Sequence, residues 1–98
     1  MINDKTMKLK IGFVLREVCG ENVIVGEGLE AFNFGQMIVL NPSAAWLWKK
    51  AQETSDFTID SQAKSLCEHY DVNLDQARID VSNIVTEWIN VGVVDFNK

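Results

Sequence analysis

The sequence has no long apolar run, no recognisable signal peptide and only two cysteines. None of its apolar segments approaches the roughly 20 residues that span a bilayer, so no membrane association is expected. The opening MINDKTMKLK is not followed by an apolar segment, which argues against a signal peptide. The two cysteines, Cys19 and Cys67, form no CxxC pair, which favours reduced thiols in a cytoplasmic protein.

Motifs for catalysis and for metal binding are also missing. The sequence contains no GxSxG motif, no glycine-rich phosphate loop and no cysteine with a base nearby. His69 is the only histidine, and no second ligand lies at metal-site spacing from it. The segment Asp71–Asp75 resembles the start of a calcium loop but lacks the later Gly and Glu. We therefore predict no catalytic residue, no metal, no cofactor and no enzyme activity.

Positive charge is scarce in the second half of the chain. The formal net charge is −5, and from Glu53 onward nine carboxylates are balanced only by Lys64, Arg78 and Lys98. Nucleic-acid binders normally carry a basic stripe that displaces counterions from phosphate. The sequence lacks that stripe, so nucleic acid is not an expected partner.

What remains suits one small α+β domain. At 98 residues with 47% apolar residues, the chain can form one modest core. Because the first nine residues are mostly polar, we expect residues 1–10 to be a flexible tail and residues 11–98 to form the domain.

The first half of the domain has the pattern of β-strands. Residues 12–18 partly alternate between apolar and polar, CGEN has turn residues and VIVG is again apolar, which together predict a hairpin. QMIVLN predicts a third strand. Met37 and Val39 share one face of that strand and Ile38 and Leu40 the other, so only one pair is expected in the core.

The second half predicts three helices. Asn41 is a good N-cap and Pro42 a good first residue for the first helix, whose apolar face reads Ala44, Leu47, Trp48 and Ala51. Trp46 points away from that face, so it either contacts a partner or covers the adjacent sheet. Thr58 can cap the second helix.

The third helix has an unusually wide apolar arc. Asn73 and Gln76 resemble a capping box at its start, and Gly92 suits its end. At 100° per residue, one stripe contains Ala77, Val81, Ile84 and Trp88, and the neighbouring stripe contains Arg78, Ser82, Val85 and Ile89. We expect the first stripe in the core and the second beside a cleft.

Three strands followed by three helices predict a winged-helix-like arrangement. The order of IVLNPSAAWLW, an acidic break and SLCEHYDVNLDQARIDVSNIVTEWINVGVVD is similar to the PqqD-like family, which includes the coenzyme PQQ synthesis protein D. The resemblance covers about residues 11–95. It implies a non-catalytic domain without a cofactor that holds the leader of a ribosomally made precursor peptide (RiPP). The domain would present the leader to a modifying enzyme, which in PQQ synthesis is a radical S-adenosylmethionine (radical SAM) enzyme.

The resemblance also implies that the leader adds as a strand beside the third strand, in a cleft against the third helix. An open strand edge suits this mode of binding. The candidate peptide-binding residues are Gln36, Met37, Ile38, Val39 and Leu40 on the strand and Arg78, Ser82, Val85 and Ile89 on the helix. Arg78 either meets a leader carboxylate or pairs on the surface with Asp75 or Ser82.

Two alternative functions remain open at this point. A winged-helix transcriptional regulator fits the outline of the fold, but Asp75, Asp80 and Glu87 in the third helix would repel phosphate. A structural module is the other alternative, in which the exposed strand edge pairs with a second copy to form a homodimer.

Overall fold

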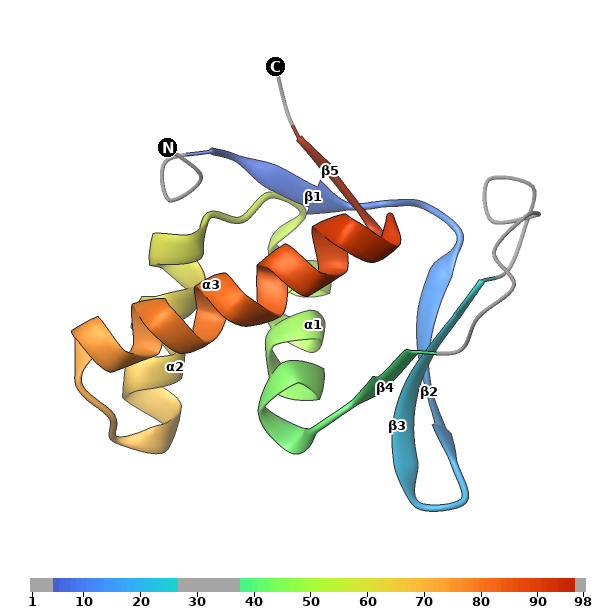
Figure 1. Cartoon of the computed structure of the whole chain (residues 1–98), viewed down its shortest axis with the longest axis horizontal. Helices are drawn as coiled ribbons and strands as arrows, with labels where there is room; N and C mark the ends of the chain where they lie inside the picture. The colour runs from blue at the N-terminus through green and yellow to red at the C-terminus, as the bar shows by residue number, and fades with distance from the viewer. Residues whose placement is uncertain (1–4, 27–37, 97–98) are drawn as a thin grey trace.

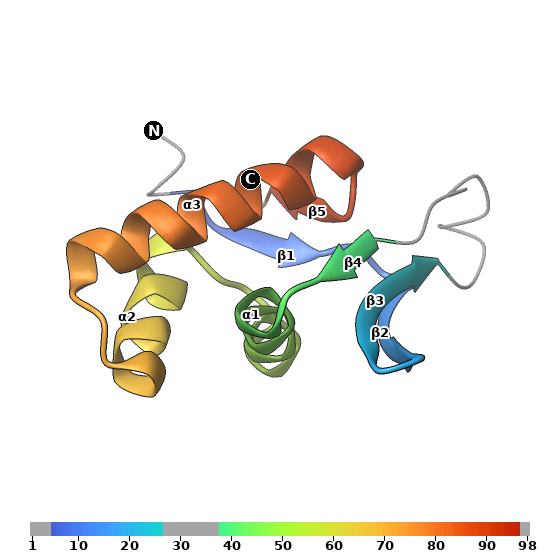
Figure 2. The same ribbon diagram turned by 60° about the horizontal axis from the view of Figure 1, so that its bottom comes forward.

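The computed structural model describes residues 5–26 and 38–96, which form two small antiparallel sheets and three helices (Figures 1 and 2). One sheet has the strand order β2–β3–β4, and the other pairs β1 with β5. The elements are β1 (Met7–Leu9), β2 (Phe13–Val18), β3 (Glu21–Gly26), β4 (Ile38–Leu40), α1 (Pro42–Thr54), α2 (Ile59–Tyr70), α3 (Leu74–Val91) and β5 (Val94–Phe96). The predicted α+β fold, a three-stranded antiparallel sheet followed by three helices, is confirmed.

The β2–β3 hairpin is closed by the shortest common turn. Cys19 and Gly20 connect the strands, and both have positive φ angles, 52° and 81°. Two central residues with positive φ define a type I′ turn, whose twist matches that of the flanking strands. Val18 and Glu21 are therefore paired directly across the turn, and the register of the whole hairpin starts from them.

The N-terminal segment differs from the flexible tail that the sequence suggested. Met7–Leu9 form β1, which pairs with β5 at the other end of the chain. The Met7 side chain is 0% exposed, and its backbone exchanges two hydrogen bonds of 2.8 Å with Phe57, in the connection between α1 and α2. A strand of three residues has no alternation to read, and its partners lie far away in the sequence. The structure therefore extends the ordered domain to residues that look like a polar tail.

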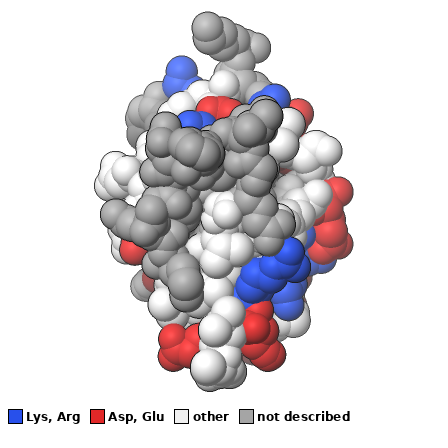
Figure 3. All heavy atoms as spheres, turned by 90° about the vertical axis from the view of Figure 1, so that its right-hand side faces the viewer, with Lys and Arg blue, Asp and Glu red and all other residues white. Residues whose placement is uncertain are grey.

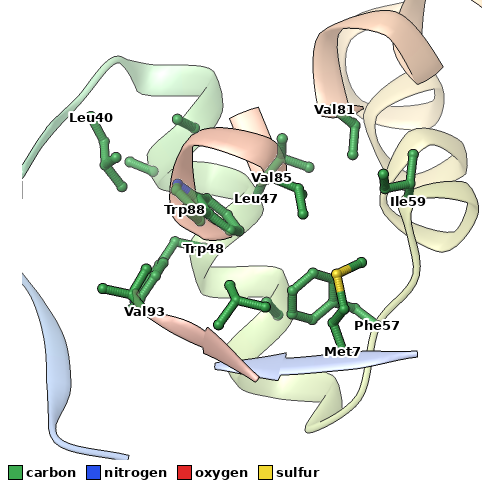
Figure 4. Close-up of a cluster of buried hydrophobic side chains, with 14 of the residues drawn as sticks. Met7, Leu40, Leu47, Trp48, Phe57, Ile59, Val81, Val85, Trp88 and Val93 are labelled. Atoms are coloured by element: carbon green, nitrogen blue, oxygen red, sulfur yellow. The ribbon is translucent and has the colours of Figure 1, made fainter. Parts of the chain in front are cut away.

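The core is centred on aromatic side chains from three parts of the chain (Figure 4). Trp48 of α1 and Trp88 of α3 meet edge to face, with ring centroids 5.2 Å apart and planes 83° apart. Phe57 approaches Trp88 in the same manner at 6.4 Å. The apolar face predicted for the first helix is buried as expected, and its members are Ala44, Leu47, Trp48 and Ala51.

Side-chain hydrogen bonds cap the starts of α2 and α3, and one buried side chain joins α2 to α1. Thr58 and Ser61 form a complete capping box at the start of α2. At the start of α3, the Asn73 side chain accepts from the Gln76 N–H, but the Gln76 side chain does not return the bond and so the predicted capping box is only half formed. The buried Gln62 of α2 donates to the Leu47 carbonyl of α1 at 3.0 Å. No described helix has the length and apolar character needed to cross a membrane.

Asn41 fixes the abrupt junction between β4 and α1. Its side-chain oxygen accepts from the Ala44 N–H at 2.8 Å, and Pro42 occupies the first turn, where it has no N–H to satisfy. We expect Asn41→Ala to lower the free energy of unfolding by about 1 kcal/mol, because the cap acceptor is lost. Urea unfolding measures this change. Asn41→Ser retains an acceptor and should recover most of the loss, and equal loss in both variants would contradict the capping role.

Candidate functional site

The outer edge of β4 has no strand partner in the described part of the chain. The sheet order places β4 at the end of the three-stranded sheet, with β3 on one side only. In an antiparallel sheet, successive residues direct their N–H and C=O groups alternately to one side and to the other. The outward-directed groups of β4 are therefore available to an added strand.

The hairpin turn and the register between β3 and β4 together determine which residue of β4 presents those groups. In a two-residue hairpin, the residues that flank the turn, Val18 and Glu21, bond to each other. Counting along β3 from Glu21, the alternate residues Asn22 and Ile24 direct their backbone groups away from β2 and toward β4.

Val39 is the residue of β4 whose backbone faces the open edge. Asn22 and Ile24 are paired with Leu40 and Ile38, so these two residues of β4 bond to β3. Val39, between them, directs its N–H and C=O to the opposite side. Ile38 and Leu40 are 8% and 7% exposed, whereas Val39 is 58% exposed. The predicted division of the strand into a core face and a free face is therefore observed.

A groove begins where β4 ends and continues along α3. It has a volume of about 310 Å³ and is lined by Asn41, Ser43, Leu66, Asp80, Asn83 and Ile84. We call it the edge groove. Its base is apolar, because Leu66 is buried and Ile84 packs partly against the core, and its remaining lining is polar. In both ribbon views the axes of α3 and β4 are roughly aligned, although the two elements run in opposite directions, so an extended chain added to β4 would lie roughly along the helix (Figures 1 and 2).

The flank of α3 at the edge groove differs from the stripe that the sequence suggested. Val85, expected beside the cleft, is 0% exposed and belongs to the core with Ala77, Val81 and Trp88. Ile84, expected in the core stripe, lies at the groove instead. The cleft assignment is therefore wrong for Val85, because the buried arc of α3 is centred slightly further toward Val85 than the expected stripe.

Arg78 is engaged within the domain. Its Nε donates to Oδ1 of Asp60 in α2 at 2.8 Å, and its Nη1 lies 3.6 Å from Oδ1 of Asp75. This hydrogen bond lowers the pKa of the Asp60 carboxyl and raises the pKa of the Arg78 guanidinium, and the attraction of the two charges adds to both shifts. Of the two alternatives for Arg78, the structure shows surface pairing, with Asp75 as expected. Asp60 is an additional partner that the sequence did not indicate.

The other two expected helix residues, Ser82 and Ile89, are not among the residues that line the edge groove. Ser82 shares a separate hollow with Arg78, Ile79 and Asn83. Ile89 packs partly against the core. The groove beside the end of β4 is instead lined on α3 by Asp80, Asn83 and Ile84, which the sequence did not single out. Gln36 and Met37, the first two candidate residues of the strand, lie outside the described residues.

Trp46 lies against α2. Its ring stacks on His69 with centroids 4.4 Å apart and planes 10° apart, and Tyr70 meets it edge-on at 5.9 Å. Lys50 Nζ lies 5.4 Å from the centroid of the Trp46 ring. The ring remains partly exposed, so its role as a partner contact stays a prediction.

Charge on α3 is poorly suited to phosphate. Its carboxylates Asp75, Asp80 and Glu87 outnumber Arg78, which is already paired with carboxylates. On the hairpin side of the molecule, basic side chains lie close to acidic ones instead of forming a continuous stripe among the described residues (Figure 3). These features disfavour α3 as a helix that reads nucleic acid.

Comparison with known proteins identifies the family. The sequence model of the family described as coenzyme PQQ synthesis protein D (PqqD) matches residues 16–94, which include the second half of β2, all of β3 and β4, and all three helices. The chain belongs to the PqqD family. No curated protein matches it closely enough to count as a relative.

Two solved structures share the PqqD-family fold of this chain. A lasso peptide synthetase B1 complexed with the leader peptide is 18% identical, with a TM-score of 0.70, and the match covers 91% of this chain and 96% of that one. TbiB1 in complex with the TbiA(beta) leader peptide is 15% identical, with a TM-score of 0.72, and the match covers 90% and 94%. At these identities the likeness concerns the fold.

Proposed function

We propose that this PqqD-family protein is a RiPP recognition element that binds the leader of a ribosomally made precursor peptide by strand addition to β4. The observation that carries the proposal is the open backbone edge at Val39, next to a groove with an apolar base. The two structural neighbours are complexes with leader peptides, which supports the same ligand class here.

Strand addition accounts for affinity and for selectivity separately. Each backbone hydrogen bond to the edge contributes about 1 kcal/mol net, and ordering a flexible peptide offsets part of that gain. Side-chain contacts in the edge groove must supply the remaining affinity, and they depend on the peptide sequence. The apolar base formed by Leu66 and Ile84 suits one apolar leader side chain.

The proposed role does not require this chain to catalyse a reaction. Its proposed task is to hold the leader and to present the rest of the precursor to a modifying enzyme of the radical SAM type, in the cytoplasm. Trp46, on the outer surface of α1 and α2, is the proposed contact for that enzyme. A homodimer formed through the β4 edge would compete with the leader for the same backbone groups.

An NMR titration tests the proposal. The ¹⁵N-labelled protein is titrated with a synthetic leader from a precursor peptide encoded beside the gene for this chain. Because the peptide contacts the edge and the groove, we expect the largest amide shifts at Ile38–Leu40 and Asn83–Ile84. Arg78 and Ser82 should shift little. A scrambled peptide of the same composition is the control.

Other shift patterns have definite meanings in this experiment. Shifts confined to surfaces away from β4 would contradict strand addition. Shifts at Ile38–Leu40 that appear on raising the protein concentration without peptide would favour self-association. Tight, salt-sensitive binding of duplex DNA would favour the regulator instead.

A further inference from the structure

Asp80 is the one charged side chain among the described residues that line the edge groove. The other lining residues are neutral: Asn41, Ser43, Leu66, Asn83 and Ile84. Asp80 is partly buried on the flank of α3 that faces the end of β4, one helical turn from Ile84. The groove therefore combines an apolar base with one fixed negative charge.

The charge of Asp80 is not neutralised within the described structure. Its Oδ1 accepts a hydrogen bond of 2.9 Å from the Gln76 amide, which is a neutral donor. Among the described residues, the ion pair of Lys10 uses Asp95, and Arg78 is held by Asp60 and Asp75. In the free protein, water stabilises the remaining lone pairs of the Asp80 carboxylate.

A peptide that fills the edge groove displaces part of that water. Desolvating a carboxylate without a partner is costly, and an opposite charge placed beside it recovers the loss. We propose that the groove selects peptides that place a Lys or Arg side chain at Asp80 and an apolar side chain at Ile84. This inference rests on the proposed function, and it deepens that function by naming the chemistry of the peptide.

The geometry also predicts the spacing of the two peptide residues. Asp80 and Ile84 are four residues apart on a helix, a rise of about 6 Å. Side chains on the same face of a strand are two residues apart, about 6.7 Å. A strand that follows α3 therefore matches both positions with one intervening residue, as apolar-x-Lys/Arg or as the same pair in reverse order.

Selection from a library of random peptides tests this preference without knowledge of the natural leader. Peptides that bind the wild-type protein but not Val39→Pro, which lacks the edge N–H, define the edge-dependent set. We expect this set to be enriched in a basic residue two positions from an apolar one. Selection on Asp80→Lys should replace the basic residue with Asp or Glu at the same position.

Single peptides from the set provide the quantitative check. Exchanging the basic residue for Glu should weaken binding to the wild type by about ten-fold or more, and Asp80→Lys should restore it. Glu68→Lys makes the equivalent charge change on an exposed position of α2 outside the edge groove, and it should leave the preference unchanged. Circular dichroism verifies that each variant is folded.

The outcomes separate this inference from the proposed function. An edge-dependent set without basic enrichment, or a Glu68→Lys effect equal to that of Asp80→Lys, would overturn the role of Asp80 and leave strand addition standing. Failure to recover any edge-dependent peptide would overturn both.

Discussion

Val39→Pro is expected to leave the fold intact and to weaken leader binding by at least about 30-fold. The Val39 N–H lies outside the β3–β4 hydrogen bonds, so removing it breaks no bond of the sheet. Proline is tolerated at edge positions of this kind. The bound peptide loses one backbone bond, worth about 1 kcal/mol, and keeps an unpaired carbonyl that costs about 1–3 kcal/mol. At 1.4 kcal/mol per ten-fold change, this sum gives the expected factor.

Isothermal titration calorimetry with the leader measures the loss of binding, and thermal unfolding verifies the fold. Val39→Thr is the matched control, because it keeps the N–H and a β-branched side chain while changing polarity. It should bind within a few-fold of the wild type. Leu40→Pro removes an N–H that bonds to β3 and should destabilise the sheet itself. Equal binding by Val39→Pro and Val39→Thr would contradict the assignment of the open edge.

Trp88→Ala is expected to lower the free energy of unfolding by about 3–5 kcal/mol, as large aromatic truncations in cores do. Trp88 is buried at the meeting point of α1, α3 and the Phe57 connection, so its loss affects three parts of the fold at once. For a domain of this size the midpoint of thermal unfolding should fall by at least about 12 °C. Differential scanning calorimetry and urea unfolding both measure the change.

Trp46→Ala is the matched control for this prediction, since it is the same substitution on a partly exposed ring. Its stacking with His69 and its edge contact with Tyr70 should make the loss about 1–2 kcal/mol. A Trp46→Ala loss equal to that of Trp88→Ala would contradict the central position of Trp88 in the core.

Local chemistry explains which parts of the fold are predictable from the sequence. The hairpin follows from alternation and from turn residues at Cys19–Gly20, and the α1 start follows from Asn41 and Pro42. The two faces of β4 follow from the strand period, with Val39 as the free side chain. Each signal lies within a few residues of the feature that it predicts.

The sequence-based predictions fail where the structure depends on contacts between residues that are distant in the sequence. The apolar arc of α3 is wide enough to fit two orientations, and packing against the rest of the core decides that Val85 is buried and Ile84 lies at the groove. For Arg78 the sequence offered pairing with Asp75 as one alternative but not its bond to Asp60, which belongs to another helix. The β1 strand forms because Met7 bonds to Phe57 and β1 pairs with β5, and no local sequence pattern predicts these contacts.

The alternation of residues along the strands couples the open edge of β4 to the core. Because a strand alternates at every residue, the turn that pairs Val18 with Glu21 and the register between β3 and β4 together assign the free amide to Val39 and the buried side chains to Ile38 and Leu40. A slip of β4 by one residue would reverse both assignments together, burying Val39 and turning the free amide to its neighbours. The burial of Ile38 and Leu40 and the outward direction of the Val39 amide therefore depend on the same β3–β4 register.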